Sequence, residues 1–558
     1  MKTLYKFGLI MSLAVVLTVN DPHISTAQLA SYDEVIECPV TTNRTLTANK
    51  KYLLRGFCNV NAPAVLTIEP GTLIYGEESS KGTLIINRGA KIIANGTKNR
   101  PIVMTSQKPI GQRGPGDWGG LIIAGNAAIN VPGGVATLEG GTNTQYGGGT
   151  NPNDNDDSGV LRYFRLEFSG IPFQPDNEIN GITLGGVGRG TVIQYVQVSF
   201  NGDDSWEWFG GTVNAKYIIS HAAWDDDFDT DTGFSGNIQY ALSVRNPNLA
   251  DVSGSNGFES DNATNDAVGA TASPRTRATF SNVTLIGPKA TPETQINTLF
   301  RNGQQIRRGS HTSTYNSVIL GWPTNGILVD GDPTNTAASN GQMEVRNTII
   351  AGAATPVNAN RSAIIPNGTN WFLAAGKGNN TYPNNTDVKL VNPFLVTNPD
   401  PRPTSDSPAA SGASFSSLRL LDTFFDNVPY RGAFSPTQPR WDAGWAAYNP
   451  QNIDYSKGIP TSLEIEQSIP TEFALEQNYP NPFNPTTTIS FQLSRADLVT
   501  LKVYDITGRE VATLMNNERR PSGYNSAVFN AYGLSSGVYF YTLSVGSSTL
   551  TQKMTLIK

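Results

Sequence analysis

Three consecutive units, TVIQYVQVSFNGDDSWEWFGG (191–211), NAKYIISHAAWDDDFDTDTGFSG (214–236) and NIQYALSVRN (237–246), repeat one short pattern. Tyr195, Tyr217 and Tyr240 mark this repeat at spacings of 22 and 23 residues. Helical solenoids have longer repeats and an apolar period of 3.6 residues, which is missing here. Short β-rich runs and glycine turns at this period therefore predict the coils of a parallel β-helix, stacked about 4.8 Å apart.

Stacking these units places acidic residues in columns. We align the units on Trp206, Phe228 and Phe258, which we expect to point inward, and strand alternation then points the next residue of each unit outward. The outward columns are Glu207, Asp229 and Glu259, followed two residues later by Asp231 and Asp261. Two further columns precede the anchors: Asp204, Asp226 and Asn256, and next to them Asp203, Asp225 and Ser255.

This acidic patch requires a physical explanation. Two carboxylates 4.8 Å apart repel by about 3 to 4 kcal/mol at an effective dielectric constant of 20. A cation between them is one hypothesis, and oxygen ligands of this kind suit Ca²⁺. A fully solvated acidic stripe and a catalytic carboxylate site, with Asp226 as candidate, are the alternatives. Zinc is not expected because His221 and His311 lack suitably spaced partners, and neither a nucleotide nor haem is expected.

Tryptophan and arginine residues lie close to the patch in the sequence. Strand alternation places Trp206 and Trp208 inside the coil, whereas Trp224 falls in a turn and is expected to be exposed. In the same alignment QQIRRG (304–309) places Arg307 next in the column of Glu207, beside Arg308. These arginines either neutralise the column as ion pairs or act as catalytic or sugar-acid-binding groups.

The N-terminus has the pattern of a signal peptide over residues 1–27. MKTLYK is basic, FGLIMSLAVVLTV is apolar, and Ser25 and Ala27 are small residues suited to cleavage. A short membrane anchor is the alternative, and no later segment is apolar enough to span a bilayer. In an exported protein the only two cysteines, Cys38 and Cys58, are expected to form a disulfide that contributes about 3 kcal/mol, although two free thiols remain an alternative.

Composition and length restrict the number of structural units and the class of partner. The chain has 558 residues with a net charge of -6, so we expect at least two structural units and no nucleic-acid partner. We expect the β-helix to occupy residues 28–455. Its last part, which includes DPRPTSDSPAASGA (400–413) and WDAGWAAYNPQN (441–452), is proline-rich and aperiodic, and we expect it to cap the open end. Residues 456–472 have the composition of a linker.

The C-terminal residues 473–558 resemble the type A sorting domain of the type IX secretion system. The resemblance rests on FALEQNYPNPFNPTTTISFQL (473–493), VTLKVYDITGREVATL (499–514) and the terminal QKMTLIK. It implies a small β-sandwich that the outer-membrane machinery of Bacteroidetes-like bacteria recognises, followed by surface attachment or release. The sorting motif comprises Asn478, Tyr479, Pro480, Asn481, Pro482, Phe483, Asn484 and Pro485.

Residues 31–455 resemble secreted right-handed β-helix proteins that carry such tails. GDWGGLIIAGNAAIN (116–130), ITLGGVG (182–188) and DDSWEWFGGTVNAKY (203–217) carry this likeness. Pectate-lyase-like enzymes share the architecture and commonly use Ca²⁺ with a basic residue, whereas the Gly-His-Gly and Arg-x-Lys signatures of polygalacturonase-like enzymes are missing from this sequence. Fold alone does not establish an activity. We therefore expect a non-catalytic surface or secreted protein for adhesion or glycan contact, with a Ca²⁺-dependent polysaccharide lyase or other carbohydrate-active enzyme as the alternative.

Overall fold

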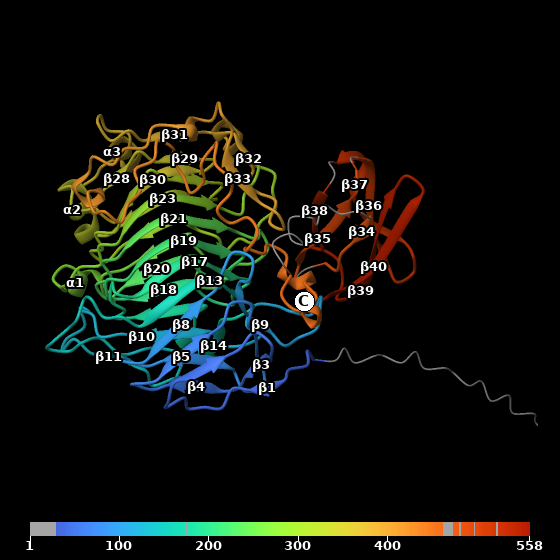
Figure 1. The fold of residues 1–558 in the computed structure, drawn as a ribbon. Helices are drawn as coiled ribbons and strands as arrows, with labels where there is room; N and C mark the ends of the chain where they lie inside the picture. Colours follow the sequence, from blue (N-terminus) through green and yellow to red (C-terminus); the bar gives the residue numbers. More distant parts are fainter. Residues whose placement is uncertain are drawn as a thin grey trace, which may run out of the picture.

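The structure is a computed structural model that describes residues 29–174, 177–460, 473–478, 481–495, 497–520 and 523–557. The predicted signal peptide, residues 1–27, lies outside the described residues, as do residues 461–472 of the predicted linker. The described chain forms a stack of β-coils and a separate C-terminal pair of sheets (Figure 1). The parallel β-helix predicted from the repeat is confirmed.

One face of the stack is a sheet of ten parallel strands, here called sheet B. From the N-terminal end these strands are β4 (Phe57–Val60), β7 (Thr83–Ile86), β10 (Leu121–Ala124), β16 (Ile182–Gly185), β18 (Trp206–Phe209), β20 (Phe228–Asp231), β22 (Phe258–Ser260), β24 (Asn302–Ile306), β27 (Asn325–Asp330) and β30 (Thr355–Asn360). Trp206 pairs with Phe228, and Phe228 pairs with Phe258, which is the register predicted from the sequence.

The other strands of the coils belong to a second parallel sheet, sheet A. They are β1 (Glu34–Val35), β2 (Arg44–Leu46), β3 (Lys51–Leu54), β5 (Val65–Ile68), β6 (Leu73–Gly76), β8 (Lys91–Asn95), β9 (Ile102–Ser106), β13 (Gly159–Glu167), β17 (Val192–Ser199), β19 (Asn214–His221), β21 (Asn237–Val244), β23 (Thr279–Ile286), β25 (Ser313–Tyr315), β26 (Val318–Leu320), β28 (Val345–Arg346), β29 (Ile349–Ala351) and β31 (Asn380–Tyr382).

Sheet A bends at one position in every central coil. Tyr163, Tyr195, Tyr217 and Tyr240 occupy this corner with φ between 45° and 61°, and their rings stack 4.4 to 4.9 Å apart. In later coils the same position holds asparagine, which tolerates positive φ better than most residues. The tyrosines that mark the repeat are therefore corner residues, and their stacked rings lie outside the coil core.

Apolar side chains fill the interior of the stack. Trp206 and Trp208 are fully buried, with their ring centroids 5.6 Å apart, and Phe228 lies 5.4 Å from Phe258. Trp224 is 36% exposed in its turn. The predicted orientations of these tryptophans are confirmed, and burial of such large rings supplies much of the hydrophobic stabilisation.

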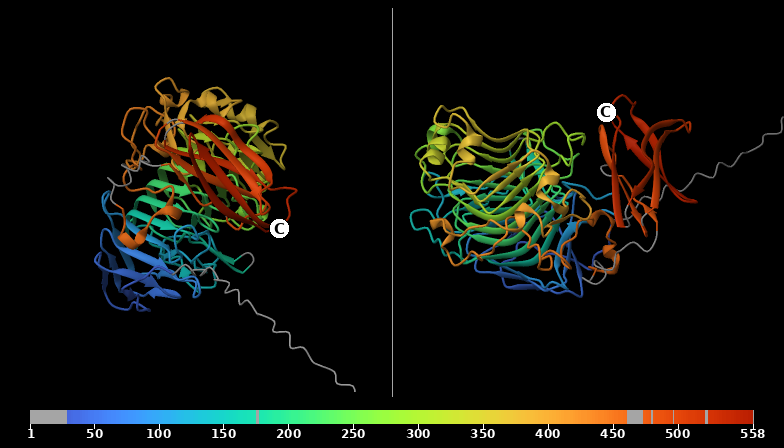
Figure 2. Two further views of the ribbon diagram at one scale, coloured as in Figure 1. Left: turned by 90° about the vertical axis from the view of Figure 1, so that its right-hand side faces the viewer. Right: turned by 90° about the horizontal axis from the view of Figure 1, so that it is seen from above.

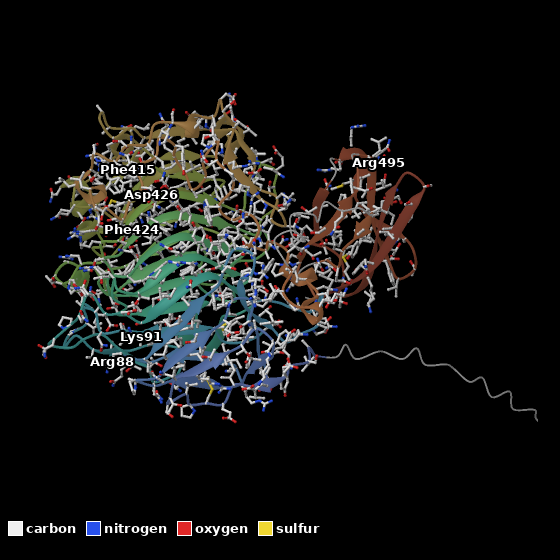
Figure 3. All side chains as sticks on the ribbon, in the orientation of Figure 1. Arg88, Lys91, Phe415, Phe424, Asp426 and Arg495 are labelled. Atoms are coloured by element: carbon white, nitrogen blue, oxygen red, sulfur yellow. A yellow bond between two sulfur atoms is a disulfide. The ribbon has the colours of Figure 1, made fainter. Side chains whose placement is uncertain are left out.

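The segment predicted to cap the open end takes a different course. It runs lengthwise along the outer face of sheet A toward the N-terminal end: Ser414 N donates to Asn316, Asp426 N to Gln239, and Ala447 N to Gln197, each at 2.8 Å. We call residues 404–455 the return segment, and Figure 3 shows its Phe415, Phe424 and Asp426 beside the upper coils. The prediction of an end cap is wrong because this segment satisfies polar groups along the side of the sheet.

Three short helices of the described chain lie in the turns that follow strands of sheet B in the later coils. They are α1 (Asp266–Gly269), α2 (Asp332–Ser339) and α3 (Gly368–Phe372). Trp371 Nε1 of α3 donates to the carbonyl oxygen of Ala338 in α2 at 3.2 Å, and Phe372 and Ala337 are buried in the coil core. Helices α2 and α3 cover the end of the stack, which is the role expected of the return segment.

Several small elements complete the body. Hairpins β11 (Ala136–Thr137) with β12 (Gln145–Tyr146) and β14 (Ile171–Gln174) with β15 (Asn177–Ile179) project from the early coils, and β32 (Leu390–Asn392) pairs with β33 (Asp400–Pro403). The 3-10 turns in the described part of the body are η1 (Asn385–Val388), η2 (Pro408–Ala410), η3 (Leu418–Leu420), η4 (Pro450–Asn452) and η5 (Tyr455–Lys457). The predicted disulfide between Cys38 and Cys58 is confirmed, with the two Cα atoms 5.1 Å apart.

The C-terminal unit consists of two antiparallel sheets around a core of its own. One sheet contains β34 (Ala474–Leu475), β35 (Thr486–Leu493) and β38 (Gly523–Asn530); the other contains β36 (Asp497–Asp505), β37 (Glu510–Arg520), β39 (Gly537–Val545) and β40 (Ser548–Leu556). Figure 2 shows this sandwich beside the coil stack. Polar contacts join the two, including Asn452 Nδ2 to Glu476 at 2.8 Å and Asn248 Nδ2 to Thr488 at 2.7 Å.

Candidate functional site

The predicted acidic columns lie side by side on sheet B and the turn that precedes it. Glu207 pairs with Asp229, and Asp229 with Glu259, on the neighbouring strands β18, β20 and β22. Glu207 and Asp204 are nevertheless buried, and Asp229 is only partly exposed. We call this feature the acidic groove. The alternative of a fully solvated acidic stripe is therefore wrong.

The column of Asp204 and Asp226 is a hydrogen-bonded ladder. Asp226 N donates to Asp204 Oδ1 at 2.8 Å, and Asn256 N donates to Asp226 Oδ1. In the following coil Asn302 N donates to Asn256 Oδ1 at 3.1 Å, so asparagine continues the same contact. Both oxygens of Asp226 accept from Asn256, which gives this catalytic candidate a structural role.

The adjacent column of Asp203, Asp225 and Ser255 lies at the rim of the groove. Asp225 Oδ2 accepts from Ser253 Oγ at 2.6 Å, and Ser255 Oγ donates to the carbonyl oxygen of Trp224 at 2.7 Å. This contact fixes the backbone of Trp224, whose side chain is partly exposed, next to Asp225 in the chain. Oxygens of Asp203, Asp204 and Asp225 lie within 4.8 Å of one another.

A second carboxylate cluster lies deeper in the groove. Oxygens of Asp204, Glu207 and Asp229 lie within 4.8 Å of one another, so this cluster could hold a metal ion. Asp229 Oδ1 is buried and has no hydrogen-bond partner among the described residues. A buried acceptor without a donor is costly, so a cation or a proton is the expected compensation.

Sequence reasoning missed Glu139, which lies in the loop between β11 and β12. Glu139 hydrogen-bonds Glu207, and Asn180 Nδ2 donates to both of these side chains, at 3.0 Å to Glu139. Because this loop is an insertion outside the repeating coil, aligning the repeats does not show that Glu139 enters the groove. Asp227 is the opposite case: it belongs to the acidic run but points inward and pairs with the buried Arg245 at 3.2 Å.

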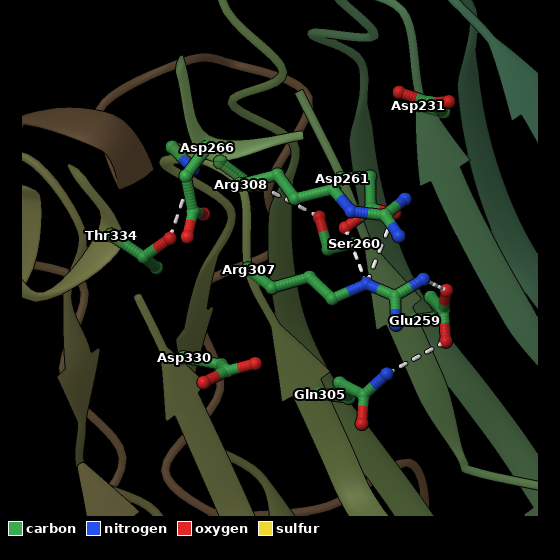
Figure 4. Close-up of polar contacts among 12 residues, drawn as sticks. Asp231, Glu259, Ser260, Asp261, Asp266, Gln305, Arg307, Arg308, Asp330 and Thr334 are labelled. Atoms are coloured by element: carbon green, nitrogen blue, oxygen red, sulfur yellow. Dashed lines mark hydrogen bonds and ion pairs between the residues drawn. The ribbon is translucent and has the colours of Figure 1, made fainter. Parts of the chain in front are cut away.

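Arginines close the C-terminal end of the groove (Figure 4). Arg307 Nε lies 2.8 Å from Asp261, its NH2 group contacts Glu259, and Arg308 NH1 lies 2.6 Å from Asp261. The predicted column position of Arg307 is wrong by two residues, since Gln305 pairs with Glu259. The ion-pair hypothesis for both arginines agrees with these contacts.

Burial strongly raises the pKa values of carboxyl groups in the groove. Burial, followed by neighbouring carboxylates, raises the pKa values of Asp203, Asp204, Glu207, Asp226 and Asp229 well above the ordinary range. Burial also raises the pKa of Asp225 to about 6. The pKa of Asp231 is raised to about 7 by burial and by Asp261, and that of Glu259 to about 7 by burial despite Arg307. The groove therefore holds protons near neutral pH unless a cation replaces them.

The two described histidines, His221 and His311, lie away from the carboxylate clusters. His221 is fully buried, its Nε2 lies 2.8 Å from the carbonyl oxygen of Val396, and burial lowers its pKa to about 4. His311 lies in a separate cavity among arginines. Neither histidine belongs to the carboxylate clusters found among the described residues.

Comparison with known proteins agrees with this architecture. A family profile described as "pectate-lyase like beta helix domain" matches residues 38–389, which is more than half of the chain. The chain belongs to this pectate-lyase-like β-helix family. A second profile, "secretion system C-terminal sorting domain", matches residues 477–558. No curated protein matches the chain.

A solved structure can be compared with this fold. It is the enzymatically active domain of tailspike protein 2 of bacteriophage CBA120, with 10% identity and a TM-score of 0.18. The match covers 90% of this chain and 72% of the other, and a TM-score this low supports no inference.

The sorting profile identifies this β-helix protein as one exported by the type IX secretion system to the cell surface or the extracellular medium. Within the sorting motif, Asn478 is buried and its Nδ2 donates to Thr487 at 2.9 Å, while Phe483 packs in the sandwich core. Tyr479 and Pro480 lie outside the described residues. No helix in the described ranges is long and apolar enough to cross a membrane.

Proposed function

We propose that this exported β-helix protein contacts glycans through a Ca²⁺ ion held in the acidic groove, without catalysing a reaction. The observation that carries the proposal is the cluster of Asp204, Glu207 and Asp229, with the unpartnered Oδ1 of Asp229. Ca²⁺ takes six to eight oxygen ligands, so three carboxylates leave positions for sugar hydroxyl or carboxylate groups. The exposed face of Trp224 beside Asp225 offers a surface on which a sugar ring can stack.

The basic residues of the groove argue against a lyase. A lyase of this type needs a basic side chain that removes a proton from the sugar. Arg307 forms ion pairs with Glu259 and Asp261, and these carboxylates raise its pKa despite burial. Arg308 is bound to Asp261 as well. Neither guanidinium is suited to accept a proton.

One observation favours a second candidate, an enzyme that hydrolyses glycans with paired carboxyl groups. Burial raises the pKa values of Glu139 and Glu207, which is the direction of shift that a general acid needs, and the two carboxyl groups hydrogen-bond each other. Asp229 on the next strand would then be the second carboxylate.

The test combines Ca²⁺ binding with a glycan array, using the full chain with Ca²⁺ and with a chelator. We expect glycan binding only with Ca²⁺, and a Ca²⁺-dependent rise in melting temperature that Mg²⁺ and NaCl of matched ionic strength do not reproduce. Asp229→Asn should abolish both effects, whereas Glu293→Gln, which removes an exposed carboxylate elsewhere, should leave them unchanged. Equal responses to Ca²⁺ and NaCl would contradict the metal site, and release of reducing sugars or unsaturated products would establish an enzyme.

A further inference from the structure

A separate cavity has a volume of about 940 Å³ and includes His311, which follows Arg308 by three residues, in its wall. The outer ends of β25 and β28 and residues 414–419 of the return segment form its walls. Its titratable lining residues include Arg275, Arg277, His311, Glu344, Arg346 and Arg419. We call this cavity the arginine pocket. It shares no lining residue with the acidic groove.

The one carboxylate that lines the pocket is already occupied. Glu344 Oε1 accepts from Arg346 Nε at 2.7 Å, and Oε2 accepts from the hydroxyls of Tyr315 at 2.6 Å and Ser417 at 3.0 Å. It therefore neutralises one arginine. Three arginines in the pocket have no ion pair with a carboxylate among the described residues: Arg275, Arg277 and Arg419.

Uncharged groups hold two of these arginines in place. Arg275 donates to the carbonyl oxygens of Gly269 and Ala270, at the end of helix α1. Arg419 donates to the carbonyl oxygens of Arg277 and Gln342 at 3.2 and 2.5 Å, which ties the return segment to two different coils. Backbone carbonyls orient a guanidinium but leave its net charge in place. Arg277 is exposed and makes no such contact.

The positive charge of these arginines contributes to the lowered pKa of His311 in the same pocket. Burial, together with the charges of Arg275, Arg419 and Arg277, lowers the pKa of His311 to about 4. His311 is therefore neutral at pH 7, and the positive charge of the pocket belongs to the arginines. Concentrating unpaired guanidinium groups in one cavity is unfavourable unless an anion binds between them.

We propose that the arginine pocket binds the carboxylate or sulfate groups of an acidic saccharide. Arginine forks match carboxylate and sulfate geometry and bind them with two parallel hydrogen bonds. A single inorganic anion would fill little of a 940 Å³ cavity, which is near the upper end of small-molecule sites. Ser416, Asn347 and Gln342 add hydroxyl and amide groups at the wall, suited to sugar hydroxyls.

This site differs from the glycan contact proposed for the acidic groove, because it selects negatively charged saccharides and needs no metal ion. A nucleic acid is less well matched, since the chain has a net charge of -6. The two sites can be separated by experiment, because a chelator removes the first and a single arginine substitution weakens the second.

The experiment is isothermal titration calorimetry of the full chain in chelator, which silences the acidic groove. The probes are oligogalacturonate, which carries carboxylates; a chondroitin sulfate oligosaccharide; a neutral maltooligosaccharide of equal length; inorganic sulfate; and a short single-stranded DNA. We expect at least one acidic saccharide to bind, with an affinity that falls as salt rises, and the neutral saccharide to show no binding.

Variants assign the binding to the pocket. Arg277→Gln removes an exposed guanidinium that makes no ion pair, so folding should be unaffected and the dissociation constant should rise by roughly tenfold. Arg275→Gln is a second variant on a different wall. Arg495→Gln is the matched control, since it removes one exposed arginine from the sorting sandwich (Figure 3).

Four results would overturn the proposal: no acidic saccharide binds, both pocket variants bind as tightly as the original chain, inorganic sulfate alone binds, or the DNA binds as tightly as the saccharides. Weakening by Arg277→Gln or Arg275→Gln, with Arg495→Gln unchanged, supports it. Melting temperatures of all variants verify that each protein is folded. Repeating the titration with Asp229→Asn, which should bind the acidic saccharide normally, keeps the result independent of the calcium proposal.

Discussion

Asp229 and Asp261 lie on neighbouring coils of sheet B, yet their electrostatic surroundings differ. Arg307 and Arg308 both contact Asp261 within ion-pair distance. Asp229 contacts no cation within the described residues and keeps one buried oxygen without a donor. Burial and the neighbouring Glu259 therefore hold its pKa far above the ordinary range. Asp261 thus takes part in structural ion pairs at one end of the groove, whereas Asp229 is a candidate metal ligand.

Stability should depend on pH in a direction set by these shifts. A carboxyl whose pKa is higher in the folded than in the unfolded state binds protons preferentially when folded, so stability falls as pH rises through that pKa. Asp225, at about 6, and Asp231 and Glu259, at about 7, place this loss between about pH 4 and pH 7. We expect the metal-free protein to melt several degrees higher at pH 5 than at pH 8.

The measurement is thermal unfolding followed by circular dichroism across this pH range, with chelator and with Ca²⁺. Ca²⁺ should raise the melting temperature at pH 8 more than at pH 5, because the cation competes with protons for the same oxygens. A metal-free melting temperature that rises from pH 5 to pH 8 would show that the groove carboxylates do not retain their protons.

At the scale of elements, columns of equivalent residues connect the coils. The ladder changes from aspartate to asparagine between Asp226 and Asn256, although the oxygen at each position accepts the backbone N–H of the next coil. The corner changes from Tyr240 to Asn282 at the same φ. In both columns the backbone sets what the residue must provide: an acceptor oxygen in the ladder and a positive φ at the corner. More than one residue type can provide it.

This ladder leads to a prediction about Asp226. Asp226→Asn keeps the acceptor oxygen and removes a charge from a crowded groove, so it should leave the melting temperature unchanged or raise it. Asp226→Ala leaves the buried N–H of Asn256 without a partner and should cost about 1–3 kcal/mol. Chemical unfolding of both variants measures the difference. Equal destabilisation by Asn and Ala would mean that the negative charge itself is required, as a metal ligand would be.

The sequence predicted the periodic part of the molecule well, because one register relates every coil. Pairing of Trp206, Phe228 and Phe258 follows from counting residues, and so does the groove column of Glu207 and Asp229. Prediction failed where the chain leaves the repeat. The insertion before β24 displaced Arg307 by two residues, and the return segment lies on sheet A through contacts between residues about 100 to 250 positions apart.

The direction of side chains from aperiodic segments was the other feature that the sequence did not predict. Glu139 reaches the groove from an inserted hairpin, and the arginine pocket combines residues from four successive coils with the return segment. Local periodicity carries no information about such pairings, because they depend on where an aperiodic segment docks. The disulfide could be predicted, since an exported chain with two cysteines permits only one intramolecular pairing.

At the scale of the whole molecule, the coil stack and the sorting sandwich have separate hydrophobic cores. The described contacts that join them are polar and few, such as those of Glu476 with Asn449 and Asn452. Each unit is therefore expected to fold on its own core. This independence separates the export signal in the sandwich from the two proposed binding sites in the coils.

Deletion of residues 473–558 tests this separation. Because the coil core, the disulfide and the covering helices all lie within residues 29–460, the truncated protein should unfold at a temperature within a few degrees of the full chain. Because the sorting sequence is lost, it should remain in the periplasm of a host with a type IX secretion system. Cell fractionation and protease accessibility on intact cells locate the protein.

As a control, residues 456–558 fused to an unrelated periplasmic protein should carry that protein to the surface. Surface exposure of the truncated chain would show that the coils contain an export signal, and its aggregation would show that the sandwich is needed for folding.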